Sequence, residues 1–222
     1  MKQSNTTEQK MNSIRAGILG ANDGILTTCG VLFSTSIASG NLTLIFLTGI
    51  SNLFACALSM GSGEFMSVSS QRDLEQQLIK KESNKLRNNR KEQLFQISKY
   101  YQNLGVSKEL ADETSKHFSN PIQELLENNY NIELGHAVSP ISAALFSLIF
   151  ALIFGSLPLL FMCISPEHLR LPLTLIGCLI SSNLVTYLSG KLSNSFTFKS
   201  LIKNTIFVLI CILANYIFGY LI

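Results

Sequence analysis

Residues 24–63 read GILTTCGVLFSTSIASGNLTLIFLTGISNLFACALSMGSG and contain no Asp, Glu, Lys or Arg. One acidic residue stands at each edge of this stretch, Asp23 before it and Glu64 after it. A helix that crosses a bilayer needs about 20 mostly apolar residues, so the stretch accounts for most of two crossings. The uncharged segment 37–41 is short enough to connect them tightly. The two helices are therefore expected to form an antiparallel hairpin.

Hydropathy predicts five membrane-spanning helices in all. They are residues 14–34, 42–66, 139–163, 171–188 and 204–222. Only 14% of the chain is charged, and most of that charge lies between the second and third spans, which indicates a polar insert there. The predicted fold is all-α, a polytopic membrane protein with a helical cytoplasmic insert. The expected divisions are a disordered cytoplasmic N-terminus (1–12), spans one and two (13–70), the insert (71–137) and spans three to five (138–222).

The basic residues predict the orientation of the chain in the bilayer. Ten of the 17 Lys and Arg residues lie between spans two and three, and only Arg170 falls on the opposite side. Positive charge collects on the cytoplasmic side, so the N-terminus and the insert are expected there and the C-terminus on the far side. The Lys-, Asn- and Ile-rich composition favours a bacterial inner membrane.

Several classes of function have no support in the sequence. Basic residues with interleaved aromatics are absent, so no nucleic-acid partner is expected. There is no nucleophile motif, phosphate-binding loop or CxxC pair, and therefore no reason to expect an enzyme or a bound cofactor.

Asp23 and Glu64 are the residues most suggestive of function. A carboxylate inside hydrocarbon costs about 2.5–3.5 kcal/mol on insertion scales, so it usually faces a polar path or a cation. On the second span Asn52, Cys56, Met60 and Glu64 are four residues apart and share one face. We therefore predict a metal route with Asp23, its neighbour Asn22, Met60 and Glu64 as candidate ligands. The alternatives are a structural pair between Asp23 and Arg15, and simple packing for Met60.

Two glutamates of the insert, Glu75 and Glu82, are further candidate metal ligands. Their helix also carries Lys and Arg, and by spacing alone such a mixture favours a solvated helix face. No breaker separates the second span from the first helix of the insert, which predicts one continuous helix to about residue 87.

Two motifs carry a family resemblance. Residues 20–24 (GANDG) and 59–73 (SMGSGEFMSVSSQRD) resemble the vacuolar iron transporter family, which includes nodulin-like members. The resemblance implies a homodimer with five spans per subunit that exports Fe²⁺, often also Mn²⁺, from the cytosol in exchange for protons. It also implies that Asp23 and Met60 line the path at the dimer interface, with Glu64 beside them.

The insert departs from the pattern of family members that bind metal there. Where the family has paired glutamates in an E-x-x-E-L pattern, this chain has Glu82 and Lys85 before Leu86. The second pair reads Gln93 and Gln96. Ligand charge sets much of the affinity for hard cations. We therefore predict a degenerate metal-binding domain that keeps its helices and dimer contacts but stores metal weakly or not at all.

Two functional hypotheses follow from these residues. The first is an Fe²⁺ or Mn²⁺/proton antiporter in the lipid bilayer, with the metal ions and protons as substrates. The alternative is a non-transporting membrane scaffold whose insert binds a partner. A carrier for another solute is a third reading, although the lack of deeply placed basic residues argues against an anion.

Overall fold

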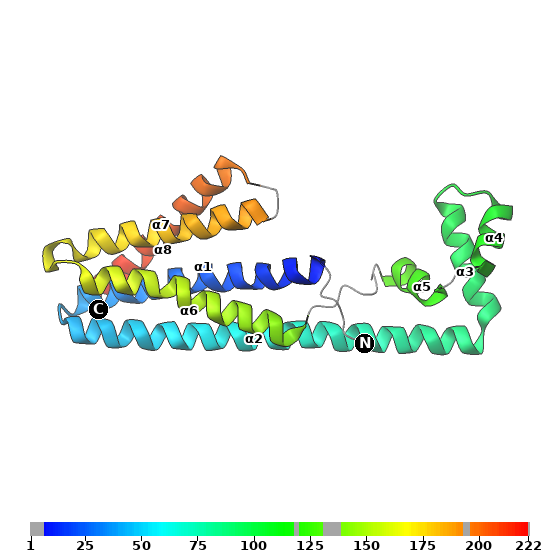
Figure 1. Ribbon diagram of the computed structural model, residues 1–222, viewed down its shortest axis with the longest axis horizontal. Coiled ribbons are helices and arrows are strands. Elements are labelled where there is room, and N and C mark those ends of the chain that lie inside the picture. Colours follow the sequence, from blue (N-terminus) through cyan, green and yellow to red (C-terminus); the bar gives the residue numbers. More distant parts are fainter. Residues whose placement is uncertain (1–6, 118–119, 131–138, 193–195, 222) are drawn as a thin grey trace. The chain divides into compact units, whose positions relative to one another are not determined.

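The computed structural model describes residues 7–117, 120–130, 139–192 and 196–221, and the elements formed by these residues are helices, without strands. Five helices are long: α1 (Thr7–Ala38), α2 (Leu42–Asn88), α6 (Pro140–Ile164), α7 (Arg170–Leu192) and α8 (Phe198–Leu221) (Figure 1). Four elements are short: α3 (Arg90–Asn103), α4 (Lys108–His117), α5 (Pro121–Tyr130) and the 3₁₀ turn η1 (Glu167–Leu169). Each long helix contains a stretch apolar enough to cross a membrane, which confirms the predicted all-α fold with five candidate spans.

Helix α1 begins earlier than the sequence indicated. Residues 1–12 were expected to be disordered, but α1 starts at Thr7, and residues 1–6 lie outside the described part of the chain.

The chain divides into two compact units. The membrane unit comprises residues 1–68 and 138–222, and the insert comprises residues 69–137. Helix α2 is continuous from Leu42 to Asn88, as predicted, and contributes its first part to the membrane unit and its second to the insert.

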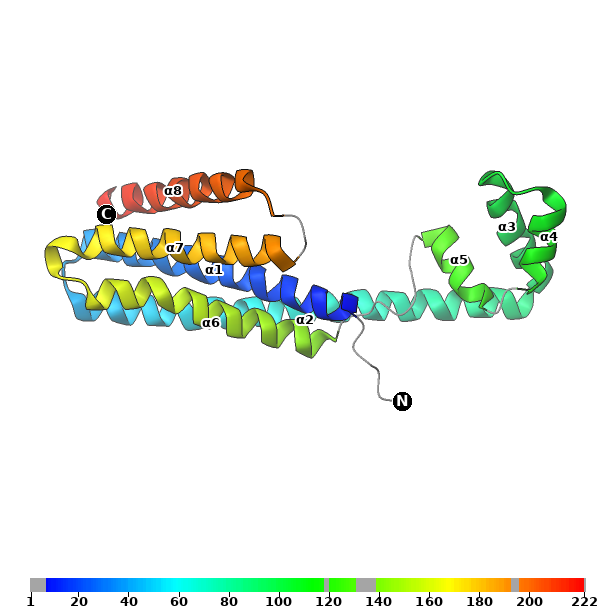
Figure 2. The ribbon, with the colours of Figure 1, turned by 45° about the horizontal axis from the view of Figure 1, so that its top comes forward.

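Helix α1 is the central element of the membrane unit. Of its most apolar window 61% is buried, compared with 22% for α2 and 11% for α8. Figure 2 shows α1 between α7 on one side and α6 on the other. The principal core groups α1 residues with residues of α7 and α8: Ala21, Ile25, Cys29, Phe33, Cys178, Val185, Val208 and Ile212.

Glycines on α1 allow α6 to approach closely. A Cβ added to Gly20 would come within 2.4 Å of the Ser147 carbonyl oxygen, and one added to Gly24 within 2.6 Å of the Ala151 carbonyl oxygen. Any larger side chain would therefore push the two backbones apart. Gly20 and Gly24 thus form a small-residue face on α1, and the helix that meets it is α6.

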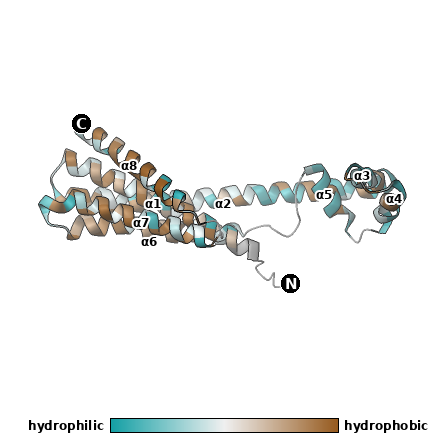
Figure 3. Ribbon diagram, turned by 90° about the horizontal axis from the view of Figure 1, so that it is seen from above, coloured by the Kyte–Doolittle hydropathy of each residue, from teal (hydrophilic) through white to brown (hydrophobic). Residues whose placement is uncertain are grey.

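The insert packs through a small core and several polar contacts. Its buried apolar residues include Ile97 on α3, Ala111 on α4, and Leu125 and Leu126 on α5. Figure 3 shows α3, α4 and α5 with many hydrophilic residues, whereas α6 and α8 are largely hydrophobic. This contrast in hydropathy agrees with the predicted positions of the membrane spans.

Candidate functional site

Asp23 lies on the exposed side of α1. Its neighbour Gly24 is buried against α6, and Asn22 is half-buried. Across the described residues no hydrogen bond or ion pair involves the Asp23 carboxylate, and the only salt bridge found there joins Lys85 to Glu82. The predicted alternative, a pair between Asp23 and Arg15, is therefore not formed. Thr27 donates to the backbone oxygen of Asp23 and leaves the carboxylate free for another partner.

Met60 and Glu64 lie on a half-buried strip of α2. The adjacent residues Ala57 and Gly61 are buried, and a Cβ added to Gly61 would come within 3.2 Å of Leu148 on α6. Met60 and Glu64 therefore stand at the edge of the contact between α2 and α6. Cys56 and Asn52 continue the same strip toward the loop that joins α1 to α2.

Contacts near that loop set the register between α1 and α2. The Thr48 hydroxyl donates to the Thr35 hydroxyl over 3.4 Å, and a Cβ added to Gly49 would lie 2.7 Å from the Leu32 side chain. Asp23 lies twelve residues before Thr35, and Met60 lies twelve residues after Thr48. Both distances correspond to about 18 Å of antiparallel helix, at about 1.5 Å per residue. By this count Asp23 and Met60 lie at about the same distance from the loop, which we call the Asp23–Met60 level, and Glu64 lies one turn farther from it.

This arrangement combines one carboxylate, one thioether and a second carboxylate on neighbouring helices. Carboxylates suit hard and borderline divalent cations, and thioethers favour softer ones. The combination suits a first-row ion such as Fe²⁺ or Mn²⁺ better than Ca²⁺ or Mg²⁺. No group of three or more His, Cys, Asp or Glu side chains that could hold a metal occurs among the described residues of this single chain.

Glu82 is the best-defined acidic group of the insert. Its side chain is 0% exposed, and its Oε1 accepts hydrogen bonds from Lys85 Nζ at 2.8 Å and from the Tyr130 hydroxyl at 2.9 Å. The hydrogen bond to Glu82 raises the pKa of Lys85 above its usual value. The ammonium of Lys85 therefore stands where a metal cation would neutralise the glutamate. Glu75 is half-buried and accepts a hydrogen bond from Gln71 at 3.3 Å.

Tyrosines of the insert are residues that the sequence analysis missed. Tyr130 donates to Glu82 from α5, and its ring lies 5.7 Å from the Lys81 ammonium. Tyr101 donates to Glu124 at 2.7 Å, and burial together with this bond raises the pKa of Tyr101 to about 12. No local pattern could have paired Tyr130 with Glu82, because 48 positions separate them.

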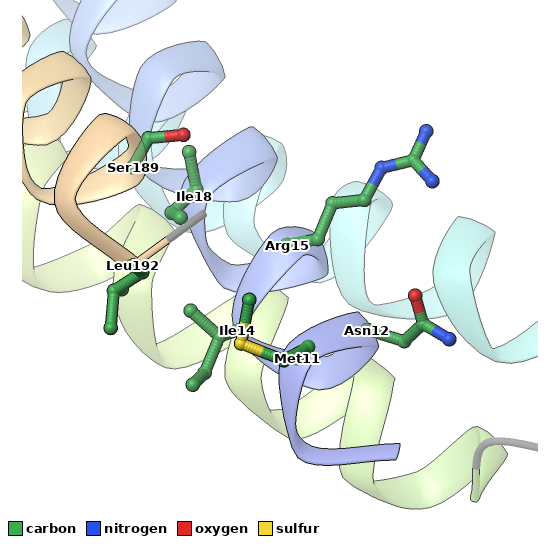
Figure 4. A pocket seen from close by; sticks show the side chains of 7 residues that line it. All are labelled: Met11, Asn12, Ile14, Arg15, Ile18, Ser189 and Leu192. Carbon is green, nitrogen blue, oxygen red and sulfur yellow. The ribbon is translucent and has the colours of Figure 1, made fainter. Parts of the chain in front are cut away.

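A groove between the ends of α1 and α7 has a volume of about 350 Å³. Its lining consists of Met11, Asn12, Ile14, Arg15, Ile18, Ser189 and Leu192 (Figure 4). The Arg15 guanidinium points away from Ser189 and Leu192, so mostly apolar side chains face the groove. These residues include no carboxylate and no histidine, and the groove is unsuited to a divalent metal.

Comparisons with known proteins identify relatives of this chain. Over 151 residues the chain is 34% identical to a "Vacuolar iron transporter" of Acanthamoeba castellanii, a match that covers 66% of this chain and 54% of that protein. It is 41% identical over 70 residues to "Vacuolar iron transporter homolog 3" of Arabidopsis thaliana, covering 32% of this chain and 35% of the relative. The matches thus span about half of the first relative's length and a third of the second's.

The sequence model of the VIT family matches residues 14–220. This range includes the α1–α2 hairpin, the insert and the three remaining apolar helices. The match therefore extends over nearly the whole chain, including both motifs on which the sequence resemblance depends. On this evidence the chain belongs to the VIT family.

Proposed function

We propose that this protein is a divalent metal/proton antiporter that exports Fe²⁺ or Mn²⁺ from the cytosol. The observation that carries the proposal is the Asp23 carboxylate, which lies within an apolar helix, faces outward and has no partner among the described residues. Such a group in a bilayer needs a cation, a proton or water. Met60 at the same level supplies a soft ligand, and Glu64 a second carboxylate one turn away.

Proton coupling follows from the chemistry of these ligands. A carboxylate must be deprotonated to bind a metal ion, so a proton and a divalent cation compete for the same oxygens. If Asp23 is exposed to one side of the membrane at a time, then metal leaves when a proton arrives. One acidic group thus supplies the minimum that an exchanger needs.

A second copy of the chain would complete the path. Only 22% of the apolar window of α2 is buried within one chain. Asp23 is exposed, and contact between its carboxylate and lipid tails would be unfavourable. A homodimer that joins the α1–α2 faces would surround Asp23, Met60 and Glu64 with protein. The family resemblance supports the same assembly.

We further propose that the insert does not store metal. Lys85 already neutralises the buried Glu82, and a divalent ion would have to displace that ammonium. The distribution of Lys and Arg supports a cytoplasmic N-terminus and insert and a C-terminus on the far side. The Lys-, Asn- and Ile-rich composition supports a bacterial inner membrane.

The test is metal uptake into proteoliposomes under an imposed pH gradient. Wild-type protein should transport Fe²⁺ and Mn²⁺, and Asp23→Asn should abolish flux because the amide keeps the shape but loses the charge. Glu109→Gln is the matched control, since Glu109 is an exposed acid of the insert. Gradient-independent flux would refute proton coupling. Absence of flux from well-folded wild-type dimers would favour the scaffold hypothesis, with which the Lys85–Glu82 ion pair of the insert is also compatible.

A further inference from the structure

Polar side chains continue beyond Asp23 and Met60 into the half of the hairpin nearest the α1–α2 loop. Asn52 lies two turns beyond Met60 on α2, and the Thr35–Thr48 hydroxyl contact follows one turn later. On α1, Thr28 lies five residues beyond Asp23 and its side chain is 0% exposed. We call Thr28, Asn52 and the Thr35–Thr48 pair the outer polar set.

Two members of this set carry buried polar atoms without a hydrogen-bond partner in the described chain, Asn52 Nδ2 and Thr28 Oγ1. A buried polar group without a partner is destabilising, and native proteins rarely retain one without a reason. Two other asparagines of the membrane unit do have partners. Asn183 donates to the Leu179 carbonyl and to Thr205, and Asn204 donates to Ser182.

The register of the hairpin places these two groups near one another along the helix axis. Counting from the Thr35–Thr48 contact, Asn52 is level with Val31, which is three residues from Thr28. The difference amounts to about 4.5 Å of helix rise. Rotation of the Asn52 side-chain amide by 180° exchanges the positions of its oxygen and nitrogen. The amide oxygen can therefore occupy the buried position where the nitrogen now lacks a partner. Amide and hydroxyl oxygens are both ligands that hard cations accept.

We infer that Asn52 and Thr28 form a second ligand station on the metal route, between the Asp23–Met60 level and the far side of the membrane. This inference rests on the proposed transport function. Both groups are neutral, and a neutral oxygen set holds a divalent cation more weakly than carboxylates do. A weak second site of this kind accepts the metal ion from Asp23 and then releases it from the protein, because transport requires binding that is weak enough for release.

The experiment compares Asn52→Ala and Asn52→Asp with the wild type in the same proteoliposome assay, together with thermal stability of the full-length protein in detergent. Asn52→Ala removes an amide that has no partner for its nitrogen, so the melting temperature should stay the same or rise. Its Mn²⁺ flux should fall about tenfold, a loss typical of groups that tune a metal site. Asn52→Asp adds charge, so the Mn²⁺ concentration at half-maximal flux and the maximal rate should both fall.

Asn183→Ala is the matched control, because Asn183 has its hydrogen bonds within the membrane unit. It should lower the melting temperature and leave flux per folded protein unchanged. Wild-type flux from Asn52→Ala, or a loss of stability like that of Asn183→Ala, would overturn the inference and leave the proposed function standing. Absence of wild-type flux would overturn both.

Discussion

Replacing Tyr130 by Phe isolates the contact that joins α5 to α2 inside the insert. The Tyr130 hydroxyl donates to Glu82 Oε1 at 2.9 Å, and Lys85 donates to the same oxygen at 2.8 Å. The other carboxylate oxygen of Glu82 is buried without a partner among the described residues. The phenyl ring keeps the packing of Tyr130 and its position near Lys81, so the substitution removes little more than one donor.

The expected cost follows from the acceptor's charge and burial. A hydrogen bond to a charged group contributes about 1.5–3 kcal/mol, and Glu82 is 0% exposed, so water cannot replace the lost donor without opening the contact. Lys85 is 43% exposed and compensates only in part, because solvent screens its charge. We expect the free energy of local opening of α5 to fall by about 1.5–3 kcal/mol.

Hydrogen exchange measured by mass spectrometry on the full-length protein resolves this local effect. Peptides that cover α5 and residues 78–88 of α2 should exchange about 10–150 times faster in Tyr130→Phe, since 1.36 kcal/mol corresponds to a factor of ten. Peptides from α6, α7 and α8 should exchange as in the wild type.

Tyr100→Phe is the matched control, because Tyr100 lies in the same unit and makes an edge contact with Tyr101 without a recorded hydrogen bond from its hydroxyl in the described chain. Its effect should stay within about 0.5 kcal/mol, as for most substitutions away from special contacts. Equal exchange rates in the two variants would refute the assigned role of the Tyr130–Glu82 bond.

Two further predictions concern the charges of the insert. Lys85→Glu places a second carboxylate one turn from Glu82, so α5 should exchange faster without metal and regain about 2.7 kcal/mol of protection at Mn²⁺ one hundredfold above its dissociation constant. The wild type should not respond to Mn²⁺, and a response there would contradict the Lys85 argument. The pKa of Tyr101 is raised to about 12 and that of Lys85 above 10.5, so the stability that both contribute is present below pH 10 and is lost as pH rises through these values. Tyrosinate absorbance should show one wild-type tyrosine titrating near pH 12 that is missing in Tyr101→Phe, and an identical titration of both proteins would contradict this assignment.

The sequence by itself determined the five apolar helices, the tight connection between the first two, and the helical character of the insert. These features depend on local composition. A run of 40 residues without charge, such as 24–63, is stable only in a bilayer or in a large core. Two glycines four residues apart on a helix, such as Gly20 and Gly24, indicate close contact with another helix. The same local reasoning singled out Asp23, Met60 and Glu64, because a charge within an apolar span is exceptional in any fold.

Only the tertiary structure decided which groups meet. It selected α6 as the partner of Gly20 and Gly24, left Asp23 without the Arg15 pair, and placed Tyr130 on Glu82 across 48 positions of sequence. Such contacts depend on how helices pack against one another. By composition alone, one apolar helix face can pack against several other helices equally well. Backbone clearance and side-chain shape determine which helix it contacts.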